Sequence, residues 1–251
     1  MAGKRKKAGT VLRRVALLLF IITLIVSLFY LGNDVRDLYS VKLKYTRIKN
    51  DIQDEKTKIV DFERLWKINP DIVAWIEIEN TGISYPVVRA KSNDEYLYKD
   101  IEGNYSIYGS IFLDERLHDT EIIKNRNNII YGHNMGSWTG VMFGELKEYL
   151  DSSFLKGHES VTLYTPDITL HYTIASVMHA DISSGVYETD IKGDYGKWIE
   201  EQINKSLYPC AGLSERKMSR CKRALTLSTC DTTHDNSEKI VVFCVESKTD
   251  D

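Results

Sequence analysis

The chain has 251 residues, which is enough for one catalytic domain of ordinary size and an appendage. Its composition, 43% hydrophobic and 27% charged, is that of a globular protein and excludes a chain that is disordered or membrane-embedded throughout. A net charge of -3 argues against nucleic acid as a partner.

The first elements in chain order are a basic segment and an apolar run. Residues 1–14 are rich in Lys and Arg, and residues 15–31 carry no charge. The uncharged run is about as long as the shortest helices that span a bilayer. A cleaved signal peptide is the alternative to a retained anchor, but bulky residues rather than small ones close the run at Leu28–Leu31. We therefore expect a single-pass anchor in the cell membrane, with residues 1–14 cytoplasmic and the rest of the chain outside.

Residues 32–70 are predicted to form a helical stalk and N-terminal helices. From Val35 to Leu65, apolar side chains recur at mostly three- and four-residue spacings among many charges, which is typical of one face of a helix. Asn69-Pro70 is expected to end this region, because proline disfavours helix in the residue before it.

From Ile72 the pattern changes to short apolar runs separated by turn residues, which predicts strands. Many short strands favour a barrel or a sandwich over alternating helices and strands. Two helices are expected among them, a short one at 143–149 and an amphipathic one at 194–206. The expected strands are 72–78, 83–88, 110–113, 128–131, 160–164, 170–177, 224–228 and 240–245. Residues 71–251 are therefore predicted to form one mainly β domain with added helices.

The four cysteines differ in their settings. Cys210 and Cys221 could pair in an exported domain, but sparse cysteine use in a domain large enough to be held by its core favours free thiols. Cys244 lies within an apolar run and is expected to be buried. Cys230 instead ends a predicted strand and enters a polar loop, where a reactive thiol would be partly exposed.

His133 is the histidine that this thiol could use. It follows Gly132 just after the strand predicted at 128–131, in a turn-prone setting that favours a rim over the core. A thiol and an imidazole are the minimum for nucleophilic catalysis by cysteine. The other histidines have no motif around them and are expected to be solvated, namely His118, His158, His171, His179 and His234.

Four motifs, in this order along the chain, resemble the sortase family, and the Ser before Thr229-Cys230 resembles its class B. The motifs are Trp75-Ile76 with Ile83–Val88, Gly109–Asp114, Tyr131–Met135 and Thr226–Cys230. The resemblance covers most of the chain after about Val60. It implies a sortase-like eight-stranded β-barrel with an N-terminal helical region and a helix before the cysteine strand.

The resemblance also implies the activity of a membrane-anchored cysteine transpeptidase. In this family the thiolate, here Cys230, attacks a backbone carbonyl after Thr in a C-terminal sorting motif, and the imidazole, here His133, exchanges protons with the departing and incoming amines. The implied partners are surface proteins with a sorting signal and an amine of peptidoglycan or lipid II. Class B relatives favour motifs of the Asn-Pro-x-Thr-Asn/Gly kind, often on haem-acquisition proteins, while some assemble pili.

One position departs from the family pattern. Where sortases have an arginine that supports the oxyanion, this chain has Lys239, which brings the charge without the planar fork of donors. Lys239 could do the work less well, Arg223 or Arg126 could substitute after a loop shift, or the chain could be an impaired relative. A solvated charge on an edge strand is the fourth possibility.

Substrate-binding residues are inferred around the two catalytic candidates. Ser228 and Thr229 precede the nucleophile, and Asn134 follows His133. The candidates for apolar groove walls, each with core packing as the alternative, are Leu113, Ile182 and Tyr187. Because no metal-binding spacing of Cys or His and no glycine-rich phosphate loop occurs, we expect neither a metal nor a cofactor.

Two other functions are compatible with the same residues. A thiol peptidase would pass the acyl group to water, and only its products would distinguish it from a transpeptidase. A non-catalytic surface protein with a sortase-like barrel would only bind peptides, and Lys239 in place of arginine keeps that alternative open.

Overall fold

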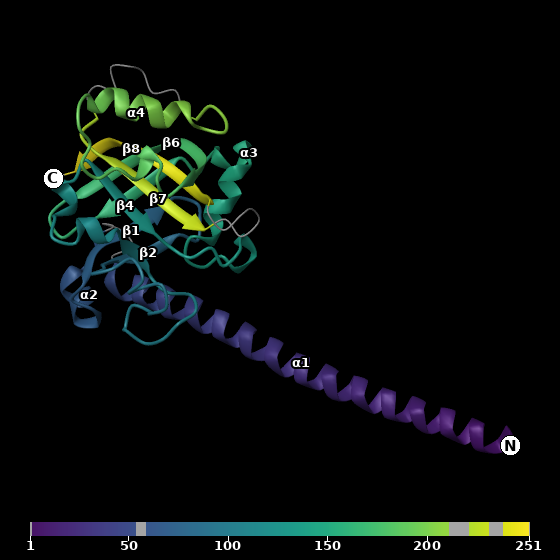
Figure 1. Ribbon diagram of the computed structural model, residues 1–251. Helices are drawn as coiled ribbons and strands as arrows, with labels where there is room; N and C mark the ends of the chain where they lie inside the picture. Colours follow the sequence, from purple (N-terminus) through teal and green to yellow (C-terminus); the bar gives the residue numbers. More distant parts are fainter. Residues whose placement is uncertain (1, 54–58, 211–220, 231–237, 251) are drawn as a thin grey trace. The chain divides into compact units, whose positions relative to one another are not determined.

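The computed structural model describes residues 2–53, 59–210, 221–230 and 238–250 (Figure 1). The chain divides into two compact units, Met1–Arg47 and Ile48–Asp251. The first unit consists of helix α1 (Ala2–Ile52), which continues into the second. The part of α1 from Leu12 onwards includes a stretch of exposed residues with a mean hydropathy of 2.7. Helix α1 is therefore long and apolar enough to cross a membrane.

The region expected to form a helical stalk and N-terminal helices contains parts of two helices, although the spacing pattern from residue 35 to 65 indicated no break between them. Helix α1 ends at Ile52, and α2 spans Phe62–Ile68. Asp61 caps α2 by accepting a hydrogen bond from a backbone N–H of its first turn, and the extended Asn69 ends it as predicted. The helical spacing of apolar residues continues across the break between the two helices, so it did not indicate the break. Asp61, a strong capping residue, was the sequence signal for the start of α2.

Eight strands form a closed barrel in the order β1-β2-β3-β4-β7-β8-β6-β5. The pairs β2–β3 and β4–β7 are parallel, and the other pairs are antiparallel. The strands are β1 (Ile72–Ile78), β2 (Ser84–Arg89), β3 (Ile111–Leu113), β4 (Asn127–Tyr131), β5 (Ser160–Tyr164), β6 (Thr169–Asp181), β7 (Ala224–Cys230) and β8 (Glu238–Asp250).

All of the predicted strands are present, which confirms the mainly β barrel. Strands β6 and β8 are longer than predicted, at 13 residues each, because they pair with each other over nearly their whole length. The short helices between the strands are η1 (Glu115–Leu117), η2 (Ile122–Lys124), η3 (Ser137–Thr139), η4 (Gly144–Leu150), α3 (Ser152–Leu155) and η5 (Gly185–Tyr187). The short helix expected at 143–149 is therefore the 3-10 helix η4.

Helix α4 (Tyr195–Asn204) packs on the outer face of the barrel beside β6 and β8 (Figure 1). Asp194 caps its first turn. Trp198 and Ile199 are buried in a cluster with Phe243, and the rings of Trp198 and Phe243 meet edge to face at 5.5 Å between centroids. Burial of each such side chain contributes about 1.5–3 kcal/mol. The same cluster contains η5, so α4 helps to fix the segment that lies behind β7.

Candidate active site

The ends of β4 and β7 bring two predicted catalytic segments together. These strands run parallel, with Tyr131 paired to Ser228, and the backbone N–H of Gly132 donates to the Ser228 carbonyl at 3.2 Å. His133 follows Gly132, and Cys230 is the last residue of β7. Neighbouring strands lie about 4.8 Å apart, so the residues at the ends of these two paired strands lie at the same lip of the barrel.

A cleft of about 300 Å³ opens at this lip. Two predicted catalytic residues, His133 and Lys239, line it, and so does Thr229, which directly precedes Cys230. Lys239 also pairs with Cys230 across β7 and β8. The backbone of Cys230 is therefore bordered on two sides by residues of the cleft, while its side chain lies outside the described part of the chain. The described lining is Asn93, Asp94, Leu97, Phe112, Tyr131, Gly132, His133, Ile182, Ser228, Thr229 and Lys239.

A larger cleft, of about 530 Å³, lies beside the start of β1 and the turn between β5 and β6. Its described lining includes Trp66, Arg89 and His118 but no cysteine and no residue of β7 or β8. Size alone would select this cleft, whereas the chemistry of a thiol enzyme selects the smaller one. Within the described residues, no group of three or more His, Cys, Asp or Glu side chains could hold a metal ion.

The imidazole of His133 is held from the loop between β2 and β3. Its Nε2 lies 2.6 Å from the carbonyl oxygen of Leu97, and its ring is 5.8 Å from that of Tyr98 between centroids. A carbonyl oxygen can only accept, so Nε2 carries a hydrogen and Nδ1 is the nitrogen left for proton exchange in the neutral ring. A fixed tautomer of this kind is what a general acid and base requires.

Two glycines allow this close approach. Gly109 has φ +59, and a Cβ there would meet the Leu97 carbonyl and His133 Cδ2, the latter at 2.9 Å. A Cβ on Gly132 would overlap the Phe143 ring at 2.8 Å. Any larger residue at either position would push the loop or the imidazole out of place.

The structure bears on which cation could serve the cleft. Arg223 forms an ion pair with Glu246 at 2.8 Å and immediately precedes β7, while Arg126 immediately precedes β4 and lies 5.0 Å from the ring centroid of Tyr195. Both therefore lie at the ends of these strands far from Cys230, about 20 Å away along β7 at about 3.3 Å per residue. In the described lining of the cleft, Lys239 is the only Lys or Arg.

The predicted binding residues divide into two groups. Ser228, Thr229 and Ile182 line the cleft, and Ile182 is 55% exposed. Leu113 and Tyr187 are buried and lie outside the described lining, so core packing, the alternative considered for them, describes their position. Asn134 is also buried, and its side-chain oxygen accepts from the Gly136 backbone, which shapes the turn after His133.

Two hydroxyl groups of β7 have different environments. The Ser228 hydroxyl lies 2.8 Å from the Tyr187 hydroxyl, so Tyr187 acts on the cleft from behind Ser228. The Thr229 hydroxyl is buried and has no hydrogen-bond partner among the described residues. A buried hydroxyl without a partner costs about 1–3 kcal/mol. A peptide bound in the cleft would relieve this penalty if its backbone reached Thr229.

The other cysteines are free and poorly suited to catalysis. Cys210, Cys221 and Cys244 form no disulfide, which agrees with the expectation for the first two. Burial raises the pKa of the Cys221 thiol to about 11, and burial also raises the pKa values of the Cys210 and Cys244 thiols. Each is therefore a protonated, unreactive thiol near neutral pH.

Sequence reasoning missed the part of the cleft that comes from the loop between β2 and β3. Asn93, Asp94 and Leu97 line it, but nothing in the spacing of this polar segment indicates a site. Phe112 and Tyr131 also line it, although the motifs Gly109–Asp114 and Tyr131–Met135 that contain them indicate no role for either. Tyr131 could have been found from the sequence, because it ends β4 two residues before His133.

Comparisons with known proteins agree with this arrangement. A family model described as "Sortase domain" matches residues 76–247. The chain is 32% identical to sortase B of Listeria monocytogenes over 205 residues, which is 81% of this chain and 78% of that protein.

Two solved structures are also similar. A crystal structure of Bacillus anthracis sortase B in complex with AAEK1 has a TM-score of 0.69 and 31% identity, and the match covers 85% of this chain and 99% of the other. A Staphylococcus aureus sortase B–substrate complex has a TM-score of 0.67 and 28% identity, and the match covers 86% and 97% of the two chains.

Proposed function

This chain belongs to the sortase family and is a transpeptidase of the sortase B type, and from that premise we propose that it cleaves a C-terminal sorting motif after Thr and joins the new carboxyl group to a peptidoglycan amine. The donor is a surface protein that carries the motif. The acceptor is an amine of peptidoglycan or of lipid II. A similar protein, sortase B of Staphylococcus aureus, has been crystallised with a substrate.

The proposed reaction has two halves that use the same residues. The Cys230 thiolate attacks the Thr carbonyl carbon, the C–N bond breaks, and protonated His133 gives its proton to the departing amine. The incoming amine then attacks the thioester, His133 takes up the proton, and the C–S bond breaks to release the thiolate. Nδ1 of His133 carries the exchanging proton, because Nε2 is bonded to the Leu97 carbonyl.

Lys239 has the role of stabilising the oxyanion that forms in each half. Its backbone is paired with that of Cys230, and its side chain lines the cleft. A positive charge near a developing oxyanion acts on the transition state more than on the bound substrate. An ammonium group supplies that charge as a point, without the bidentate geometry of a guanidinium.

The observation that carries this proposal is that His133, Lys239 and Thr229 line the same cleft, at the end of the strand that carries Cys230. Helix α1 is long and apolar enough to hold such an enzyme at a membrane. We infer that residues 1–14 are cytoplasmic and that the barrel lies outside a Gram-positive cell, where its substrates are. Protease added to intact cells would remove the barrel if this orientation is right.

Turnover of a defined peptide tests the function. The probe is a fluorogenic peptide with Asn-Pro-Gln-Thr-Asn, incubated with and without triglycine or diaminopimelate, and the products are identified by mass spectrometry. The wild type is expected to give a product in which the Thr carbonyl is joined to the added amine. Its formation should fall at least about 10³-fold in Cys230→Ala and about 10²–10⁴-fold in His133→Ala. Release without a ligated product would indicate a hydrolase. Equal turnover by all three proteins would refute catalysis at this site.

A further inference from the structure

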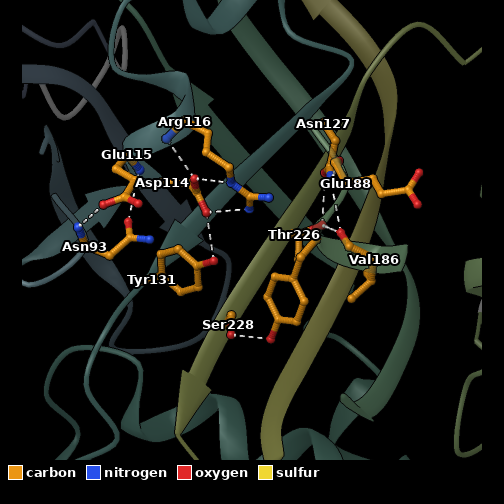
Figure 2. Close-up of polar contacts among 11 residues, drawn as sticks. Asn93, Asp114, Glu115, Arg116, Asn127, Tyr131, Val186, Glu188, Thr226 and Ser228 are labelled. Atoms are coloured by element: carbon orange, nitrogen blue, oxygen red, sulfur yellow. Dashed lines mark hydrogen bonds and ion pairs between the residues drawn. The ribbon is translucent and has the colours of Figure 1, made fainter. Parts of the chain in front are cut away.

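Asp114 and Glu115, which directly follow β3, each hydrogen-bond to a residue that lines the cleft (Figure 2). The carboxylate of Asp114 accepts a hydrogen bond from the Tyr131 hydroxyl at 2.9 Å. Glu115 and Asn93 exchange two bonds, in which the Asn93 backbone N–H donates to the Glu115 carboxylate at 2.9 Å and the Glu115 N–H donates to the Asn93 side-chain oxygen at 3.0 Å. Tyr131 and Asn93 both line the cleft, while Asp114 and Glu115 lie outside its described lining.

Arg116 fixes the direction of the Asp114 carboxylate. Its Nε and Nη2 each donate at 2.8 Å to a different carboxylate oxygen, and its backbone N–H donates at 2.9 Å. The Asp114 side chain is 0% exposed, so this fork compensates a fully buried charge. Burial alone would raise the pKa of Asp114, but the hydrogen bonds from Arg116 and Tyr131 outweigh it and hold the pKa below its usual value. The carboxylate therefore stays ionised and presents an acceptor to Tyr131.

The position of Tyr131 also affects β7. Its ring stacks on that of Tyr187 with centroids 6.3 Å apart and planes inclined by 17°, and the Tyr187 hydroxyl contacts the Ser228 hydroxyl at 2.8 Å. Tyr187 belongs to η5, which is held in turn by bonds from Asn127 and Thr226 to the Val186 carbonyl. A shift of Tyr131 would therefore be felt at Ser228, two residues from the nucleophile.

We propose that Asp114 and Glu115 are positioning residues for the donor peptide, Asp114 through Tyr131 on the strand side of the cleft and Glu115 through Asn93 on the loop side. The inference rests on the proposed function, because the ligand is the sorting peptide of that reaction. Neither residue lines the cleft itself in the described part of the chain. Their effect is to hold two cleft residues in one place before the peptide binds, which lowers the entropy lost on binding.

The first test separates positioning from catalysis. We expect Asp114→Asn to raise KM for the Asn-Pro-Gln-Thr-Asn peptide about fivefold, the net effect of about one ordinary hydrogen bond, with kcat within about twofold. The amide has a single acceptor oxygen, so it cannot replace both carboxylate oxygens that accept from Arg116 and Tyr131. We expect Glu115→Ala to raise KM about threefold and Glu115→Gln to restore it, because an amide oxygen still accepts from Asn93. Asp119→Asn is the matched control, since Asp119 lies in the same loop with its side chain 98% exposed. A fall in kcat at unchanged KM, or no rescue by Gln, would overturn the proposal.

The second test separates positioning from general destabilisation. If Asp114 acts through Tyr131, adding Asp114→Asn to Tyr131→Phe should change KM by less than about 1.5-fold, because the hydroxyl that the carboxylate holds is already absent. An equal factor in both backgrounds would show that Asp114 only supports the fold. Glu115→Ala keeps the proposal testable if Asp114→Asn does not fold.

A binding measurement keeps this inference separate from the proposed function. In a Cys230→Ala background, fluorescence anisotropy of the labelled peptide gives a Kd without turnover, and we expect Asp114→Asn to raise it about fivefold, as for KM. If the wild type binds the peptide but does not turn it over, the proposed function fails and the Kd values still decide the positioning role. If the wild type turns the peptide over and neither variant changes KM or Kd, the positioning role alone is overturned. The absence of saturable binding in the Cys230→Ala protein also overturns the positioning role alone.

Discussion

The two walls of the cleft are built from different kinds of structure. One wall is the end of β7, inside a closed sheet, where Ser228 is 1% and Thr229 is 2% exposed. The other comes from the loop between β2 and β3 and from Ile182, which follows the last residue of β6 and is 55% exposed. The strand wall is fixed by backbone pairing on both sides, and the loop wall is fixed mainly by hydrogen bonds that involve side chains, such as the two between Asn93 and Glu115.

This difference separates chemistry from selection. Reacting groups must be held within a fraction of an ångström, and paired strands do this better than loops. Loops tolerate change, so they are where affinity for a particular peptide can be adjusted. We therefore expect changes at Lys239 and at the end of β7 to act mainly on kcat, and changes on the loop wall to act mainly on KM. Tyr131, at the end of β4, is grouped with the loop wall here, because its proposed role is to position the peptide.

Alkylation of the cysteines gives the largest expected contrast. At about pH 8, a thiol of pKa about 11 such as Cys221 is roughly 10⁻³ thiolate, so its labelling by iodoacetamide should be at least about a hundredfold slower than that of Cys230. Cys210 and Cys244 should also be slow, because burial raises their pKa values. Mass spectrometry should then find one fast site, and the Cys230→Ala protein should have none. Labelling of Cys221 should rise as the pH approaches 11, and fast labelling of Cys221 near neutral pH would contradict the assignment.

Replacement of Lys239 probes the strand wall next. We expect Lys239→Ala to lower kcat about 10²-fold with KM little changed, because oxyanion stabilisation acts in the transition state. Lys239→Arg should match or exceed the wild type, since a guanidinium presents its donors in a planar fork that can bind bidentately. Lys192→Ala is the control, because that side chain is 87% exposed and lies outside the described lining of the cleft. If kcat and KM were unchanged in Lys239→Ala, Lys239 would be only a surface charge and its proposed role would be refuted.

The contrast also explains what could be predicted from the sequence. The strands of the barrel were predictable because runs such as Ile72–Ile78 combine β-branched and aromatic residues with flanking turns. The positions of Cys230 at the end of one strand and of His133 just after another were predictable because each follows an apolar run, while their catalytic roles stay predictions. The break between α1 and α2 was missed, because an N-cap at Asp61 is a weaker signal than helical spacing that continues across it.

The loop wall was not predictable, for a physical reason. Asn93 and Leu97 reach the cleft because the loop folds back over His133, and this depends on the Leu97 carbonyl meeting Nε2 and on the positive φ of Gly109. Such contacts join residues far apart in the chain and leave no periodic pattern. The sequence could not decide whether Leu113 and Tyr187 face the core or the cleft. An apolar residue in a strand or a loop suits either position equally well.

Two glycines in this loop sharpen the comparison. Gly109 and Gly103 both have positive φ, +59 and +83, so Ala at either should lower the free energy of unfolding by about 1–2 kcal/mol. Only at Gly109 would the new Cβ meet the Leu97 carbonyl and His133, whereas nothing lies within 4 Å at Gly103. We expect Gly109→Ala to lower kcat/KM about tenfold beyond Gly103→Ala, since a small misplacement of a proton-transfer group is costly. Chemical denaturation and peptide turnover measure the two effects, and equal activity in both variants would show that the loop does not position the imidazole.

The smallest effect is expected at the most exposed residue of the loop wall. Ile182→Ala removes apolar surface that a bound peptide would cover, and at about 25 cal/mol per Å² a partly covered side chain contributes enough for a rise in KM of about threefold. Because Ile182 is 55% exposed, its packing in the free protein is slight, so kcat and the thermal midpoint should stay unchanged. Leu207→Ala is matched in exposure, at 52%, and lies outside the described lining, so it should leave KM as it is. If Ile182→Ala lowered kcat instead, the loop wall would share in the chemistry, and the division between strand and loop proposed above would be wrong.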